Sequence, residues 1–295
     1  MCCFCTRWRL CIILQSMENG LQNGLRNGLL SGLNNGTNQG VFSGLVGNPD
    51  RKKFLENNYS SVFDGVNEYV SIPHNEIIDF ERTNQFSISF WIKRNNTPVT
   101  NQVIIGKYSG VAVRGYLIWF YTANSDKIQF DLLNSGANRL SVYGNTSITN
   151  TSKWYHIVTT YTGNSSPSGV KIYVDGVSET ITTGTNTLTN TIKGTNIPFT
   201  IANNSDGAFY INAFIDEVSI WNIVLSEEEV KQLYLNTGWA LKRFKNNRIL
   251  WWRGGDGATF SNNVWTFPDA SGNGNIGSSV NMEESDRSSD VPFNL

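Results

Sequence analysis

The feature that most constrains the fold of this chain is a series of short runs, beginning near Tyr59, in which apolar and polar residues alternate. In FSISFWIKR (86–94) one face carries Phe86, Ile88, Phe90 and Ile92, and the other carries Ser87, Ser89, Trp91 and Lys93. Successive side chains of a strand point to opposite faces, so this alternation predicts strands with one buried face. Further runs are YLIWFYT from Tyr116, KIQFDLL from Lys127, KWYHIVTTYT from Lys153, VKIYVDGV from Val170 and AFIDEVSIWN from Ala213. Gly, Asn, Asp and Ser separate the runs at intervals of roughly ten residues, which predicts an all-β sandwich or barrel.

Two local signals interrupt this pattern. Asp175-Gly176 follows the run VKIYV and tolerates positive φ, so it predicts a tight hairpin turn. Ser226 and Glu229 have the spacing of a capping box at the start of LSEEEVKQLYLNTG, and Gly238 is placed to end a helix. We therefore expect one short helix near 227–236 among the strands.

Five blocks, in order along the chain, resemble the laminin-G-like or concanavalin A-like jelly-roll domains: SVFDGVNEYVSIP (61–73), FSISFWIK, KWYHIVTTYTG, VKIYVDG and FIDEVSIWNIVLSEEEVKQLY. The resemblance covers about residues 59–237 and implies an antiparallel jelly-roll β-sandwich. Domains of this family serve as lectins, calcium-dependent adhesion modules, glycan-binding attachments to enzymes and structural parts. The resemblance therefore indicates the fold and leaves the ligand open.

The tail, residues 238–295, resembles the opening of such a domain placed last in the chain. ILWWRGGDGATF and DASGNGNIG (249–277) look like the aromatic-rich strand and the turn that normally precede the FDG block. Either the tail folds back to supply a strand to the sandwich, or it is the truncated start of another repeat. The first interpretation is favoured, because a free fragment would expose the large apolar side chains of Trp251, Trp252, Trp265 and Phe267 to water.

Residues 17–48 carry glycine at a regular spacing of four. In an extended chain this even period puts every Gly on one face, whereas a helix with about 3.6 residues per turn would wind the same row around its axis. We expect an extended Gly-rich arm that orders on self-association or against a partner, followed by a linker over 49–58. A plain flexible linker is the alternative. The residues assigned to assembly are Gly20, Leu21, Gly24, Leu25, Gly28, Leu29, Gly32, Leu33, Gly36, Gly40 and Gly44.

Residues 1–16 precede a second methionine, Met17, and contain all four cysteines. Three interpretations stay open for this segment: an upstream extension of the true start, a poor secretory or anchoring signal, and a cysteine or metal patch. The LCIIL run (10–14) is shorter than a signal-peptide core or a membrane span, so no spanning segment is predicted. Since no cysteine follows Met17, disulfides are not expected to hold the fold together.

Charge and residue types argue against two classes of function. The formal net charge is −1 and the one basic cluster is KRFKNNR (242–248), so nucleic-acid binding is not expected. A glycoside hydrolase needs two carboxylates flanking a cleft, and the E-x-D-x-x-E run of catalytic relatives is absent. Asp216 and Glu217 are adjacent in a predicted strand, which should turn them to opposite faces. His156 also lies within a strand and is interpreted as structural, so no catalytic residue is assigned and the chain is not expected to be an enzyme.

Calcium is the cofactor that the resemblance suggests, because relatives bind it through acidic and carbonyl oxygens at loop ends. Asp64 and Asp216 match acidic positions of the family, and Asp206 in NNSDGAF is a weaker candidate. Asp216 is expected to share a strand face with Phe214, Val218 and Ile220, where a buried carboxylate needs a cation or several N–H donors. The alternative is that Asp64 caps a turn and Asp216 is satisfied by hydrogen bonds.

Glycan binding on such a scaffold combines an aromatic platform with polar groups in neighbouring loops. Trp119 and Tyr121 alternate with Ile118 and Phe120 and are candidates for the platform, although strand aromatics are more often core. The loops 107–116, 134–139 and 203–210 are candidates for the polar part. The candidate glycan-binding residues are Trp119, Tyr121, Asn134, Asn138, Arg139 and Asn204.

Together these features predict a non-catalytic subunit of an extracellular or virion-surface assembly. The jelly roll would present a lectin-like face for glycans, and the Gly-rich arm would mediate self-association, so that many copies offset a weak single site. A purely structural jelly roll and a hydrolase with displaced carboxylates are the alternatives.

Overall fold

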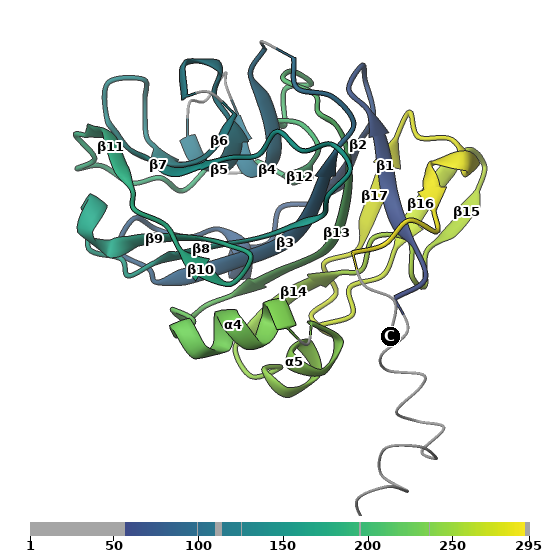
Figure 1. Ribbon diagram of the computed structural model, residues 1–295. Helices are drawn as coiled ribbons and strands as arrows, with labels where there is room; N and C mark the ends of the chain where they lie inside the picture. Colours follow the sequence, from purple (N-terminus) through teal and green to yellow (C-terminus); the bar gives the residue numbers. More distant parts are fainter. Residues whose placement is uncertain are drawn as a thin grey trace, which may run out of the picture. The chain divides into compact units, whose positions relative to one another are not determined.

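The computed structural model describes residues 57–98, 100–109, 114–124, 126–194, 196–235 and 237–292. Two antiparallel sheets lie face to face in this part of the chain, with a large apolar core between them (Figure 1). The predicted all-β sandwich is therefore confirmed. The predictions for residues 1–16, for the arm over 17–48 with its assembly residues from Gly20 to Gly44, and for most of the linker over 49–58 lie outside the described residues.

Sheet A has eight strands, and β13 lies at its centre. Its main path is β10 (Val177–Ser178), β9 (Val170–Val174), β8 (Tyr155–Tyr161), β3 (Phe86–Arg94), β13 (Asn212–Trp221), β1 (Ser60–Asp64) and β18 (Arg287–Ser288), and β14 (Arg248–Trp252) also pairs with β13. Strands β1 and β14 pair with successive halves of β13, on the side away from β3. The predicted Asp175-Gly176 turn joins β9 to β10 with φ values of 52° and 77°.

Sheet B has ten strands. Its order is β11 (Thr182–Asn186), β7 (Arg139–Ser147), β6 (Lys127–Leu133), β5 (Arg114–Phe120), β4 (Gln102–Ser109), β12 (Phe199–Ile201), β2 (Tyr69–Ile72), β17 (Gly277–Val280), β16 (Val264–Phe267) and β15 (Thr259–Ser261). Strands β4 and β5 include residues 107–109 and 114–116, so the expectation of a loop over 107–116 is wrong for those positions. The Lys107–Tyr108–Ser109 stretch pairs in register with Arg114–Gly115–Tyr116, which the sequence pattern alone did not reveal.

Two α-helices cover the outer face of sheet A. The expected helix is α4 (Glu227–Leu235), and its capping box is present, since the Ser226 N–H donates to Glu229 Oε2 at 2.8 Å. A second helix, α5 (Thr237–Arg243), was not expected and contains Gly238 instead of ending there. Apolar residues of both helices pack with Trp221 and Tyr173 of sheet A, and each fully buried side chain contributes roughly 1.5–3 kcal/mol. Four short 3-10 turns complete the described structure: Glu76–Ile78, Thr122–Asn124, Pro167–Gly169 and Glu284–Asp286.

The tail pairs with strands of both sheets. Strand β14 adds to sheet A beside β13, and β17 joins sheet B beside β2 with β16 and β15 following outward (Figure 1). Trp252, Trp265 and Phe267 are each 2% exposed and belong to the core between the sheets. Removing the tail would therefore expose core side chains, which explains physically why the chain folds back after α5.

Within the described residues, no helix is long and apolar enough to cross a membrane.

Candidate functional site

The outer face of sheet B carries a pair of aromatic rings. Trp119 on β5 points away from Ile118 and Phe120, which are buried between the sheets, as strand alternation predicts. The ring centroids of Trp119 and Tyr121 are 4.9 Å apart, and both side chains are half-buried. Since α4 and α5 lie on the sheet A side, no α-helix of the described residues covers this pair (Figure 1).

Asp131 holds Trp119 in place. Trp119 Nε1 donates to Asp131 Oδ2 at 3.1 Å, and Gln129 Nε2 donates to both Asp131 oxygens at 3.0 and 3.1 Å and to Ser141 Oγ at 2.9 Å. Burial raises the pKa of the fully buried Asp131 to about 6, although hydrogen bonds and the charge of Arg139 oppose the rise. Sequence reasoning missed Gln129, Asp131 and Ser141. The available signal was the polar alternation of KIQFDLL, which places Gln129 and Asp131 on the outward face.

Most of the polar glycan-binding candidates form hydrogen bonds that hold the loops in which they lie. Asn138 makes four hydrogen bonds to the segment 187–190, and Asn134 Nδ2 donates to a carbonyl of the same loop at 2.7 Å. Asn204 is buried, and its Oδ1 accepts from a backbone N–H of its own loop at 2.8 Å. Arg139 lies beside the Asp131 network on β7. The structure thus brings together Trp119 and Tyr121, it places Arg139 two strands away beside Asp131, and it uses the asparagines to shape loops.

The calcium candidates Asp64 and Asp206 are already bonded to their surroundings. Asp64 Oδ1 accepts from the N–H of Val66 at 2.7 Å, so the carboxylate caps the turn after β1. Asp206 Oδ1 accepts from Ser109 Oγ at 2.8 Å on sheet B. Asp64, Asp206 and Asp216 do not converge on one point in the described residues, so as a set they do not fit a single calcium ion. Calcium binding at any one of them stays a prediction.

A β-bulge in β13 changes the face on which Asp216, the third calcium candidate, lies. Glu217 has φ 51°, and the register with β3 shifts between Asp216 and Ser219. Ala213 and Ile215 point into the core before the bulge, and Val218 and Ile220 do so after it. The expectation that Asp216 shares a face with Val218 and Ile220 is therefore wrong. Asp216 lies opposite Trp91, whose ring stacks on Tyr234 of α4, so it is on the outer side of sheet A.

Asp216 and Glu217 form a buried acidic pair with its own counter-ion. Trp251, which packs on the same outer side, donates to Glu217, so the two carboxyl groups do not point to opposite faces as expected. Glu217 Oε1 accepts from Arg253 Nε at 3.1 Å, and Asp216 Oδ2 accepts from Asn57 Nδ2 at 2.7 Å. Burial raises the pKa of both carboxyl groups, and that of Asp216 rises well above its usual value. Both are enclosed, so neither is placed to meet a substrate.

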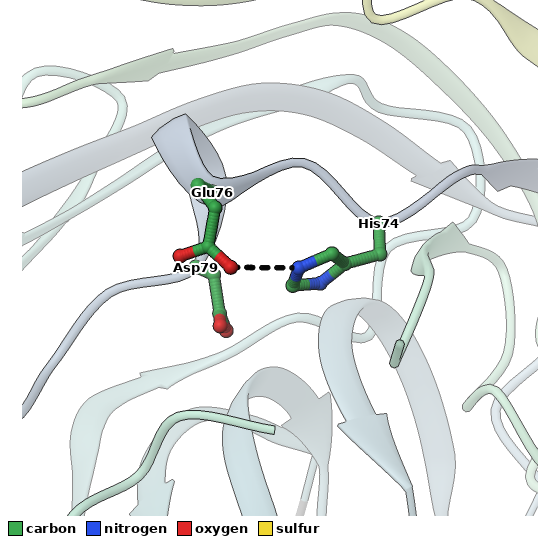
Figure 2. A group of neighbouring side chains, drawn as sticks. All are labelled: His74, Glu76 and Asp79. Carbon is green, nitrogen blue, oxygen red and sulfur yellow. Dashed lines mark hydrogen bonds and ion pairs between the residues drawn. The ribbon is translucent and has the colours of Figure 1, made fainter. Parts of the chain in front are cut away.

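Within the described residues, one group of three His, Cys, Asp or Glu side chains is close enough to bind a single metal ion. It consists of His74, Glu76 and Asp79 (Figure 2). The space they offer is taken by the buried ammonium of Lys107. Its Nζ lies 2.9 Å from His74 Nδ1, 3.2 Å from Asp79 Oδ1 and 2.7 Å from the carbonyl oxygen of Ile197. Burial lowers the pKa of Lys107, and the charge of Asp79 opposes the change. This group is therefore satisfied by a side-chain cation and does not need a metal.

His156 is structural in the described fold. Its Nε2 lies 2.9 Å from Ser89 Oγ, which has the form of a nucleophile and base pair, but both residues are buried under Trp91 and Tyr234. Burial lowers the pKa of His156 to about 3. The Nδ1 atom has no hydrogen-bond partner, so the third member of a triad is missing. The arrangement agrees with the interpretation of His156 from the sequence.

Similarity to known proteins identifies the family to which this chain belongs. A laminin G family model, described as the concanavalin A-like lectin/glucanases superfamily, matches residues 64–231, close to the expected 59–237. No curated protein sequence matches the chain.

Solved structures with a similar fold include a candidate carbohydrate-binding protein from Bacteroides ovatus, at 20% identity and a TM-score of 0.53 over 76% of this chain and 58% of that one. The heptameric SAP-like pentraxin of Limulus polyphemus is similar at 12% identity and a TM-score of 0.43, over 60% of this chain and 82% of that one. The binding domain of Paraclostridial Mosquitocidal Protein 1 is similar at 17% identity and a TM-score of 0.44, over 56% of this chain and 40% of that one. The chain thus spans less than two thirds of the length of the Bacteroides protein.

The ordered sequence blocks, the two antiparallel sheets and the match of the family model over more than half of the chain agree with one another. The chain belongs to the concanavalin A-like lectin/glucanase superfamily, in its laminin G branch.

Proposed function

We propose that this chain is a non-catalytic binding module that recognises glycans on the outer face of sheet B. The observation that carries the proposal is the Trp119–Tyr121 pair, in which both rings are partly exposed and Trp119 is held by the buried carboxylate of Asp131. A rigid aromatic surface suits the apolar face of a sugar ring, and neighbouring polar groups suit its hydroxyls. The Bacteroides ovatus protein with the same fold is itself described in terms of carbohydrate binding, which supports the same class of ligand.

The absence of enzymatic activity belongs to the same proposal. The adjacent carboxylates Asp216 and Glu217 are enclosed, and the Ser89–His156 pair lies under two aromatic rings. Within the described residues, these are the arrangements closest to known catalytic groups, and neither is accessible to a substrate.

We further propose that the chain acts as a subunit of an extracellular or virion-surface assembly, with the period-four arm mediating self-association. The support is the sequence of residues 17–48. Replacing Leu21, Leu25, Leu29 and Leu33 with Ser in the full chain tests it, because these leucines would have to be buried on assembly. Light scattering should show an oligomer or fibre for the native chain and a smaller species for the variant. Equal masses would contradict the proposal.

The glycan proposal is tested by applying the full chain to a glycan array and repeating the measurement with Trp119→Ala. The matched control is Trp154→Ala, at the residue before β8 of sheet A. Trp154 is also half-buried, and its Nε1 likewise donates to an aspartate, Asp290, at 2.8 Å. We expect binding that Trp119→Ala abolishes and Trp154→Ala retains, with both variants folded by circular dichroism.

Two other results would contradict the proposal. Equal loss in both variants would show that the effect is on folding, and no binding by the native chain would favour a purely structural jelly roll. Turnover of a bound polysaccharide would instead support the hydrolase alternative.

A further inference from the structure

A cavity adjoins the aromatic pair at the end of β5. Its volume is about 270 Å³, and its walls include Thr97, Pro98 and Thr100 from the segment before β4, with Tyr121, Thr122 and Asp126 from the connection between β5 and β6. Tyr121 belongs both to this cavity and to the ring pair with Trp119. The cavity and the Trp119 surface therefore share a wall, so one extended ligand can contact both.

The charged residue in the cavity wall is Asp126, whose carboxylate accepts hydrogen bonds. Asp126 Oδ1 accepts from Arg94 Nη1 at 2.7 Å, and 28% of the Asp126 side chain remains exposed. Arg94 is 1% exposed, and its terminal nitrogens also donate to the carbonyl of Ile148 and to Gln102 Oε1, each at 3.0 Å. The guanidinium is thus covered and does not line the cavity. Among the described lining residues, no cation is available to attract an anionic ligand.

The hydroxyl of Thr122 adds to this acceptor character. Thr122 Oγ1 donates its proton to Asn101 Oδ1 at 3.0 Å, which leaves its lone pairs for incoming donors. A ligand that fits this wall supplies hydrogen-bond donors, carries no negative charge and has an apolar face for the ring of Tyr121. Neutral sugars have these properties, because each hydroxyl donates while the C–H groups of the ring form an apolar surface.

The volume limits the size of the ligand. Pockets for drug-sized molecules are about 300–1,000 Å³, so a cavity of about 270 Å³ has room for a single ring-sized unit. Further units of the same chain must lie outside it. The adjoining surface on which they can lie is Trp119, whose ring contacts Tyr121.

We propose that this cavity, the Tyr121 cavity, binds one neutral pyranose unit of a glycan whose next unit lies on Trp119. The proposal rests on the proposed function and names its ligand class: neutral oligosaccharides, in preference to sialylated, sulfated or uronic-acid glycans. Asp126 and Thr122 accept from hydroxyls of the enclosed unit, and Tyr121 contacts its apolar face. Arg94 positions Asp126 through their ion pair.

The test blocks the cavity without altering Trp119 or the Arg94–Asp126 pair. Thr100→Tyr and Thr97→Tyr each place a ring at an exposed threonine of the cavity wall, and Thr183→Tyr on β11 makes the same change at an exposed threonine elsewhere in sheet B. Two variants are used so that a folding defect in one does not decide the result. Saturation-transfer NMR of the full chain with methyl hexosides measures the cavity directly, and calorimetry with neutral and terminally sialylated trisaccharides measures the complete site.

We expect saturation transfer to methyl hexosides in the native chain and in Thr183→Tyr, and its loss in both cavity variants. The affinity for neutral trisaccharides should fall at least tenfold in the cavity variants, and the sialylated ones should bind more weakly to the native chain. Retained affinity in both folded cavity variants, or a preference for sialylated ligands, would overturn the cavity proposal. That result would leave the proposed function intact if binding still depended on Trp119. If the native chain binds no glycan at all, both the cavity proposal and the proposed function are overturned.

Discussion

Replacing Asp131 with Asn should make the stability of the protein less dependent on pH. Burial raises the pKa of Asp131 from 3.8 to about 6, so the folded protein keeps this proton over a range in which the unfolded chain has lost it. The contribution of this carboxyl to stability therefore falls as the pH rises from about 4 to about 6. A shift of this size corresponds to about 3 kcal/mol, which is fully lost above pH 6.

Asparagine does not ionise, so the variant lacks this loss. Its carbonyl oxygen can still accept from Trp119 Nε1, while its amide group faces Gln129, a change that costs about 1 kcal/mol at every pH. The free energy of unfolding of Asp131→Asn, minus that of the native chain, should therefore rise by about 2.5 kcal/mol between pH 4 and pH 8, since part of the change already occurs below pH 4.

Urea unfolding followed by tryptophan fluorescence, at each pH unit from 4 to 8, gives this difference. Comparing the two proteins at each pH cancels the contributions of the other buried acids, including Glu68, whose pKa burial raises to about 7. A difference that stays constant within about 0.5 kcal/mol would show that Asp131 ionises as a solvated carboxyl does, and the account of the Trp119 site would then be wrong.

Two further predictions concern buried cations and imidazoles. Because burial lowers the pKa of His156 to about 3, the NMR signals of its ring should not titrate between pH 8 and pH 4, and a midpoint above pH 5 would contradict its complete enclosure. Lys107→Met leaves Asp79 buried without its cation and should lower the free energy of unfolding by about 3–5 kcal/mol in urea titrations. Adding Asp79→Asn to this variant should recover part of the lost stability. Adding Zn²⁺ or Ca²⁺ should not recover it. Recovery with either ion would show that the cluster in Figure 2 is a metal site.

Local patterns predicted much of the fold. Alternation in FSISFWIKR matches β3 from Phe86 to Arg94, and KIQFDLL matches β6 from Lys127 to Leu133. The Asp175-Gly176 turn and the Ser226 cap also appear where the sequence predicts them, because each depends on the φ preferences or hydrogen bonds of residues within one turn. The second helix was missed because Gly238, an ordinary helix terminator, is retained inside α5 by tertiary packing.

The orientation of strand side chains could be predicted only where no bulge interrupts the strand. Trp119 lies on the opposite face of β5 from Ile118 and Phe120, as alternation predicts. Asp216 does not follow the same rule, because the positive φ of Glu217 shifts the register of β13 by a residue. Nothing in the letters FIDEVS marks the position of this bulge.

The sequence by itself determined the class of fold, the position of most central strands, the short helix and the placement of Trp119 on the opposite face from Ile118 and Phe120; that this face is the outer one was decided by the packing of the two sheets. The tertiary structure alone decided which distant residues meet: Asp131 with Trp119, Arg94 with Asp126, and Lys107 with His74 and Asp79. The physical reason is the range of the interactions. Strand alternation, turns and caps are set by neighbours along the chain, whereas burial, pKa values and cavities depend on strand register and on side chains that pairing brings together from separate segments.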